Sequence, residues 1–166
     1  MRSYSSFLIT ELSQVKNCES SVFYITFAPK KGKKTMKELL LVGIGSFFGG
    51  GMRYLVAQLQ HRLMATSAVA CGTFPWATFA VNVVGCLLIG LLTGIASSGH
   101  LPAQWKLVLV TGFCGGFTTF STFMNENYLL GKDNMLMLAL YTTASLALGM
   151  AALVAGYKIA SAITTI

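Results

Sequence analysis

The chain has 166 residues, of which 54% are hydrophobic and only 10% are charged. Soluble domains carry about 25% charged residues, so the composition argues against a soluble domain and indicates an integral membrane protein. The net charge of +7 comes largely from four lysines at positions 30–34, and from residue 36 onward six basic residues accompany three acidic ones. That small excess excludes a nucleic-acid-binding surface.

Residues 1–35 differ from the rest of the chain. They are mixed in composition, and their longest apolar piece is too short to span a bilayer. Met36 and the residues after it look like a natural bacterial start ahead of a membrane helix. We therefore interpret residues 1–35 as a poorly structured basic extension from a misassigned start; the alternative is a genuine basic cytoplasmic tail. Residues 36–166 are the predicted membrane domain.

Four apolar segments follow, at about residues 39–60, 73–97, 107–130 and 134–162. Each is near or above the ~20 residues that cross the hydrocarbon core of a bilayer as a helix. Backbone groups in lipid must be satisfied within the segment, which favours helices. Because the connections are short, the sequence predicts a compact all-α membrane protein with four transmembrane helices and no soluble domain.

The basic residues near the segment ends give almost no orientation bias. One side of the membrane is flanked by Lys37, Lys106 and Lys158, and the other by Arg62 and Lys132. Arg53 lies closer to this second side. The lysine and arginine difference that normally orients a membrane protein is close to zero. Such a chain can insert in both orientations; the alternative is that a weak bias still selects one.

The third segment contains the most unusual stretch, GFCGGFTTFSTF at residues 112–123. The pairs Gly115-Gly116 and Thr118-Thr119 predict a break near the middle of this helix. Broken membrane helices are tolerated where the freed backbone is buried in protein or lines a cavity, and their carbonyls can coordinate a cation. Phe120 lies near mid-membrane in this segment.

Aromatic and hydroxyl side chains form two parallel rows after the predicted break. Phe120 and Phe123 are three residues apart and share a helix face, and Thr119 and Thr122 lie beside them. The edge of a phenylalanine ring carries the positive part of its quadrupole. This row can therefore meet an anion without binding it too tightly for conduction.

Three further polar residues lie within or beside the spans. Asn82 is an amide deep in the second segment, and it either donates to a permeating ion or makes an interhelical hydrogen bond that serves packing. Arg53 either attracts anions at a vestibule, meaning the wet mouth of the pathway, or anchors the helix at the interface. Glu126 is the only carboxylate inside the four spans and could pair with Arg53 or line the mouth.

The fourth segment carries Tyr141 and Ser145 at i, i+4 spacing, which could continue a hydroxyl track; the alternative is routine bonding of such hydroxyls to their own helix. Glycines in the first segment predict a face for close helix packing: Gly43, Gly45, Gly49, Gly50 and Gly51. We see no metal-ligand set and no nucleophile–base pair, so an enzyme is not supported. Because the polar inventory is rich in donors and poor in carboxylates, the residues indicate a pathway for a small anion.

The 112–123 stretch, with Asn82-Val83-Val84-Gly85 and Gly50-Gly51-Met52-Arg53-Tyr54, closely resembles the CrcB/Fluc family of fluoride channels from residue 36 to about 163. The resemblance implies an antiparallel dual-topology homodimer with two pores, in the bacterial inner membrane, that exports fluoride passively. An alternative is a small proton-coupled multidrug-type exporter, but those need a membrane carboxylate in the first helix, which is absent here. The first loop looks long for the family, Ala77 stands where glycine is common, and Met124 replaces a frequent small polar residue.

The resemblance also implies roles for individual residues. Phe120 and Phe123 would contribute to a phenylalanine box that contacts fluoride, Asn82 matches the pore asparagine, and Arg53 and Glu126 match vestibule positions. Ser121 and Thr122 match pore hydroxyls, and Thr119, Tyr141 and Ser145 are the further pore candidates. Gly115 and Thr118 match positions whose backbone carbonyls hold a structural sodium ion (Na+) at the dimer centre.

Overall fold

The computed structural model describes residues 33–66 and 74–164. The chain divides into two compact units, Met1–Lys37 and Glu38–Ile166. The first unit contributes to the described part only the opening residues of helix α2 (Lys33–Thr66). Because the predicted extension at residues 1–35 lies almost wholly outside the described residues, its status stays a prediction.

The second unit is built from helices joined by short connections. After α2 come α3 (Trp76–Ser97), α4 (Ala103–Lys106), the π-helical stretch η1 (Leu107–Cys114), α5 (Gly115–Phe117), α6 (Phe120–Asp133) and α7 (Met135–Thr164). All regular structure in residues 33–66 and 74–164 is helical. Within these residues four segments are long and apolar enough to cross a membrane: Thr35–Leu63, Trp76–Ser97, Ala103–Asp133 and Met135–Thr164. The prediction of an all-α protein with four spans is confirmed.

The helix bounds differ from the apolar runs by a few residues. The first helix, predicted at 39–60, occupies Lys33–Thr66, and the third span begins at Ala103 rather than at residue 107. Hydropathy marks only the part of a helix that faces hydrocarbon, whereas the helix itself continues while its backbone bonds can form. The second helix begins late, at Trp76, directly after Pro75, because a proline restricts the preceding residue to extended conformations.

The glycines of α2 let this helix pack closely on the third span. A Cβ atom on Gly45 would lie 2.1 Å from the carbonyl oxygen of Val108, and one on Gly49 would lie 2.1 Å from that of Phe113. Any larger residue at these positions would therefore collide with backbone. The predicted glycine packing face is right for these two positions, whereas nothing lies within 4 Å of a Cβ built on Gly43, Gly50 or Gly51.

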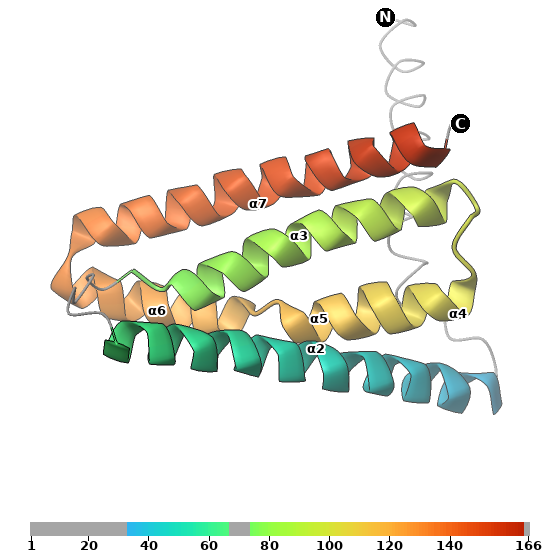
Figure 1. The fold of residues 1–166 in the computed structure, drawn as a ribbon, viewed down its shortest axis with the longest axis horizontal. Coiled ribbons are helices and arrows are strands. Elements are labelled where there is room, and N and C mark those ends of the chain that lie inside the picture. Colours follow the sequence, from blue (N-terminus) through green and yellow to red (C-terminus); the bar gives the residue numbers. More distant parts are fainter. Residues whose placement is uncertain (1–32, 67–73, 165–166) are drawn as a thin grey trace, which may run out of the picture. The chain divides into compact units, whose positions relative to one another are not determined.

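Helices α3 and α7 run side by side and form a second close packing (Figure 1). A Cβ atom on Gly90 of α3 would lie 2.0 Å from the oxygen of Leu153, and one on Gly156 of α7 would lie 2.3 Å from that of Leu87. Small residues at helix interfaces in membranes allow the backbones to approach. The sequence analysis did not single out these glycines, because many spacings in these apolar segments satisfy the same pattern.

The helix ends gather at two opposite ends of this unit. The α3–α4 connection and the C-terminal end of α7 lie together, and the turn from α6 to α7 lies at the other end with the start of α3 (Figure 1). A hydrogen bond of 2.9 Å joins the hydroxyls of Ser98 and Thr164 at the first end. At the second end the side chain of Asn134 caps α7 by accepting from the backbone N–H of Met137 at 3.1 Å. Lys106 therefore lies towards the first end and Lys132 towards the second.

Candidate functional site

The third span leaves the helical conformation at two residues near its middle. Helix α5 ends at Phe117 and α6 begins at Phe120. Between them Thr118 has φ −75° and ψ 156°, and Thr119 has φ −147° and ψ 116°, so both are extended. The ribbon in Figure 1 narrows to a coil at this point between α5 and α6. Backbone groups released from a buried helix need other partners.

The side chain of Asn82 supplies partners for Thr119. Its Nδ2 donates to the carbonyl oxygen of Thr119 at 3.1 Å, and its Oδ1 accepts from the N–H of Thr119 at 2.9 Å. This two-way pairing is the one that a neighbouring strand would make with an extended residue. Of the two roles predicted for Asn82, the structure contains the interhelical hydrogen bond. An amide nitrogen carries two hydrogens, and the bond to Thr119 uses one of them. The other could donate to an ion, and that role stays a prediction.

The pairing with Asn82 also affects the carbonyl groups of Gly115 and Thr118. In a continuous α-helix each carbonyl accepts from the N–H four residues later. For Gly115 that N–H belongs to Thr119 and donates to Asn82 instead. For Thr118 it belongs to Thr122 and donates to the hydroxyl oxygen of Thr119 at 3.3 Å. Both carbonyls that the family resemblance assigns to a cation have therefore lost their α-helical donors.

Gly85 lies one turn after Asn82 on α3 and gives room to the other extended residue. A Cβ atom at Gly85 would lie 2.1 Å from the methyl carbon of Thr118. Asn82 and Gly85 therefore act together on the break: the amide pairs with the backbone of Thr119, and the glycine accepts the side chain of Thr118. The Asn-x-x-Gly spacing was visible in the sequence, but its relation to the third span depends on tertiary packing.

The two predicted phenylalanines lie together but in different surroundings. The ring centroids of Phe120 and Phe123 are 6.2 Å apart. Phe123 is only 7% exposed and its ring lies 5.1 Å from that of Tyr141, whereas Phe120 is 75% exposed. The ring of Phe120 therefore lies on the surface of this chain, at the beginning of α6. Ser121 and Thr122 are exposed there as well.

Glu126 is held by hydroxyl groups from two other helices. Thr78 of α3 donates to its Oε1 and Tyr141 of α7 donates to its Oε2, both at 2.7 Å. Thr78 is 6% exposed and Tyr141 is completely buried. Of the two alternatives predicted for Glu126, the pairing with Arg53 is not the arrangement found; each carboxylate oxygen accepts from one of these hydroxyls instead. Thr78 was missed by the sequence analysis, although it lies one turn before Asn82.

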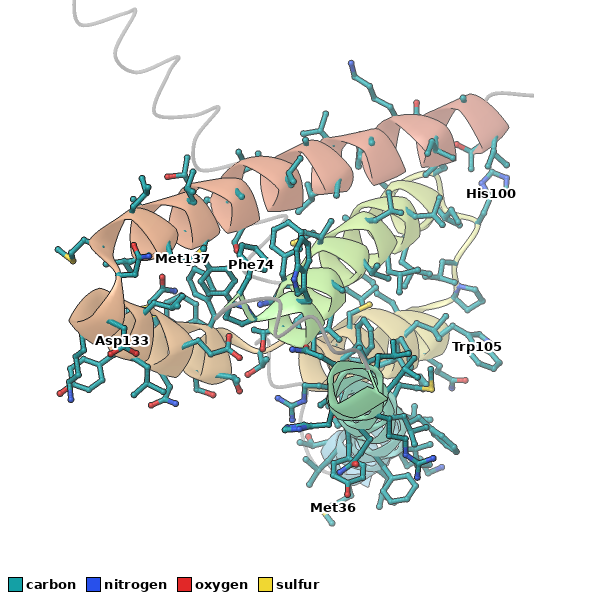
Figure 2. All side chains as sticks on the ribbon, turned by 60° about the vertical axis from the view of Figure 1, so that its left-hand side comes forward. Met36, Phe74, His100, Trp105, Asp133 and Met137 are labelled. Atoms are coloured by element: carbon teal, nitrogen blue, oxygen red, sulfur yellow. The ribbon has the colours of Figure 1, made fainter. Side chains whose placement is uncertain are left out.

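Aromatic rings pack against Tyr141, which donates to Glu126, at the start of α3. The ring of Phe74 meets that of Tyr141 nearly perpendicularly, at 5.3 Å and 84°, and that of Phe79 at 5.5 Å and 70°. Figure 2 places Phe74 at this end of the helices, while His100 and Trp105 lie at the opposite end. The hydroxyl bonds of Glu126 are thus formed beside a group of packed rings rather than in open solvent.

A cavity of about 340 Å³ opens beside the break, between α2 and the two helices that carry the hydroxyls. Its lining includes Arg53, Thr78, Thr119 and Thr122. The hydroxyls of Thr78 and Thr119 donate their single hydrogens to Glu126 and Thr122. The feature of this cavity that favours an anion over a cation is therefore the guanidinium group of Arg53. Ser145 lies outside this lining; its Oγ is buried and has no hydrogen-bond partner among the described residues, and it is not bonded to Tyr141.

These features define a small, multi-pass α-helical membrane protein whose third span is interrupted beside a cavity lined by an arginine and three threonines. A family model described as "CrcB-like protein, Camphor Resistance (CrcB)" matches residues 40–157. The chain belongs to the CrcB-like family, and the resemblance found in the sequence is confirmed.

Several curated relatives are similar to the chain over most of their own length. The chain is 47% identical over 124 residues to the fluoride-specific ion channel FluC of Prosthecochloris aestuarii, covering 74% of this chain and 91% of the relative. It is 41% identical over 130 residues to FluC of Rhizobium leguminosarum bv. trifolii, covering 77% and 99%. With FluC of Flavobacterium psychrophilum the identity is 39% over 127 residues, covering 75% and 98%.

Proposed function

We propose that this chain forms a fluoride-selective channel that exports fluoride passively across the plasma membrane and keeps cytoplasmic fluoride low. The observation that carries the proposal is the 39–47% identity to proteins named fluoride-specific ion channels, over nearly their whole length. The cavity beside the interrupted third span, which Arg53 lines, supports it independently. The relatives are named as channels, which agrees with the prediction that the protein is not an enzyme.

The fluoride pathway follows the polar side of the break and the start of α6. We assign the fluoride contacts to the residues named from the sequence: Asn82, Thr119, Phe120, Ser121, Thr122, Phe123, Tyr141 and Ser145. Arg53, which lines the cavity, is assigned to the vestibule together with Glu126. The guanidinium raises the local concentration of anions, and ring edges and hydroxyls replace part of the hydration shell. None of the assigned pore contacts carries a positive charge that would trap the ion.

The channel is proposed to be an antiparallel, dual-topology homodimer. The near-equal distribution of basic residues between the two sides supports insertion in both orientations. The exposure of the Phe120 ring, at 75%, supports a pore completed by a second copy, because an apolar ring that contacts an ion needs protein around it. The interruption of the third span also supports a pore at this place, because non-helical backbone within a membrane is tolerated only where it is buried in protein or lines a water-filled cavity.

A structural sodium ion is proposed at the dimer centre, held by the carbonyls of Gly115 and Thr118. The redirected N–H groups of Thr119 and Thr122 support this assignment, because they leave both carbonyls without their α-helical donors. Gly115 is also exposed, so its carbonyl can meet the same group of a second copy. When bound, sodium would supply the positive charge that holds these carbonyls together.

The function is tested by ion efflux from liposomes that contain the purified protein. Fluoride efflux, followed with a fluoride electrode, should exceed that of protein-free liposomes, and chloride efflux under the same gradient should be small. Equal rates for the two anions, or no fluoride efflux, would overturn the proposal. A proton-coupled exporter, the alternative raised from the sequence, would instead need a proton gradient and a carboxylate well inside the first span. Glu126 lies in the third span, and the acidic residue of Thr35–Leu63 is Glu38, close to the beginning of that span.

A further inference from the structure

Asn127 is a buried polar residue to which neither the sequence analysis nor the proposed fluoride pathway gives a role. It lies on α6, one turn after Phe123, and is only 8% exposed. Its Nδ2 donates to the carbonyl oxygen of Phe123 at 2.8 Å, and its Oδ1 accepts from the hydroxyl of Thr142 at 2.5 Å. The amide therefore uses both of its ends, one on its own helix and one on α7.

The bond to Thr142 is unusual for a threonine within a membrane helix. Such a hydroxyl commonly bonds back to a carbonyl of its own helix, as that of Thr118 does with Cys114 at 2.9 Å. The hydroxyl of Thr142 instead crosses to α6. Since a buried donor or acceptor without a partner is costly, the pairing fixes the direction of both side chains.

Two cross-helix bonds lie next to each other as a result. Glu126 accepts from Tyr141, and Asn127 accepts from Thr142, so consecutive residues of α6 are joined to consecutive residues of α7. Between them and the break lies the ring contact of Phe123 with Tyr141, at 5.1 Å. Asn127 thus bonds to the backbone of Phe123 and to Thr142. Thr142 in turn is the chain neighbour of Tyr141, whose ring contacts that of Phe123.

We propose that Asn127, held by Thr142, is a positioning residue that sets the placement of Phe123 against Tyr141. It acts on the ion only through these two residues. The inference rests on the proposed fluoride function for its activity readout, but the geometry it claims can be measured without any ion flow.

The first test is fluoride efflux from liposomes with two pairs of matched variants. Thr142→Val keeps the branched shape and removes the hydroxyl, whereas Thr142→Ser keeps the hydroxyl. Asn127→Leu removes both bonds, whereas Asn125→Leu makes the same change at an exposed position of the same helix. We expect Thr142→Val, which removes one buried hydrogen bond, to slow efflux by about tenfold. Asn127→Leu, which removes two, should slow efflux at least as much, and the two controls should stay near the parent rate.

The second test reads the ring itself, with 4-fluorophenylalanine incorporated at position 123 and followed by fluorine NMR. Thr142→Val and Asn127→Leu should shift or split the resonance, and Thr142→Ser and Asn125→Leu should not. An unchanged resonance together with parent-like efflux in both disrupting variants would overturn the inference, as would equal losses in the Asn125→Leu control. Absence of fluoride efflux in the parent protein would instead refute the fluoride function, and the fluorine resonance would still decide whether Asn127 and Thr142 position the ring.

Discussion

Phe120 and Phe123 are equivalent in the sequence pattern but differ in their surroundings. Phe123 is enclosed by its own chain, with Tyr141 against its ring, and Phe120 is exposed. A substitution of Phe123 therefore changes both packing and any contact with an ion, whereas a substitution of Phe120 changes mainly the surface that it presents. The two positions allow the aromatic contribution to conduction to be separated from the contribution to stability.

We predict that Phe120→Ile and Phe123→Ile each abolish fluoride efflux, because isoleucine has no positive ring edge to offer an anion. Phe123→Ile should also lower the free energy of unfolding by about 1 kcal/mol, as expected for a change of shape in a packed site. Phe120→Ile should lower it less, because this ring makes few contacts within its own chain. Efflux and thermal unfolding, measured on dimeric fractions of each variant, check both statements. Normal efflux in both variants would contradict the ring-edge explanation.

The glycines of α2 show how far a residue pattern determines the contact of two helices. Gly43 and Gly45 are two residues apart on one helix, yet only Gly45 lies against backbone of the third span. An added Cβ atom there would lie 2.1 Å from the oxygen of Val108, and a backbone atom cannot move aside as the end of a side chain can. Nothing lies within 4 Å of a Cβ atom on Gly43.

We predict that Gly45→Ala lowers the thermal stability of the purified protein, because α2 must move away from the third span to relieve the collision. Gly43→Ala is the matched control and should be neutral or slightly stabilising, by up to about 1 kcal/mol, since alanine favours helix over glycine. Thermal unfolding in detergent measures both. Equal stability of the two variants would show that the close approach of α2 at Gly45 contributes nothing.

The sequence predicts the spans and the polar stretch of this protein better than it predicts the contacts. Long apolar runs specify helices in lipid almost by themselves, since backbone groups have no other partners there. The local signals for a break at Thr118 and Thr119 were also present. The pairing of Asn82 with Thr119, however, joins residues 37 positions apart. Such a partner depends on how α3 packs against the third span, which the hydrophobic pattern leaves open.

The same limit applies to Glu126. Its position inside a span was visible, and an arginine was the obvious partner by charge. The structure instead gives it the hydroxyls of Thr78 and Tyr141, which no charge rule identifies. Several polar residues of this protein are paired across helices rather than along one, so their partners emerge only when the helices are assembled.

At the level of the assembled protein, the proposed sodium site links the break to the dimer. The two carbonyls are available only while the N–H of Thr119 is held by Asn82 and that of Thr122 by the hydroxyl of Thr119. If sodium binds there, the folded dimer should be more stable in its presence. A ligand at about 100 times its dissociation constant contributes about 2.7 kcal/mol, which corresponds to a shift of several degrees in the unfolding temperature.

We predict that replacing sodium by N-methylglucamine lowers the unfolding temperature of the dimer by several degrees, and that Asn82→Leu removes this dependence. Without the amide, the N–H of Thr119 can donate to the carbonyl of Gly115, as in a continuous helix, and that carbonyl is no longer available to a cation. Asn125→Leu, at an exposed position of α6, should retain the dependence. Equal unfolding temperatures of the parent in the two salts would refute the site. If Asn82→Leu kept the full sodium effect, the amide would not be what makes the carbonyl of Gly115 available.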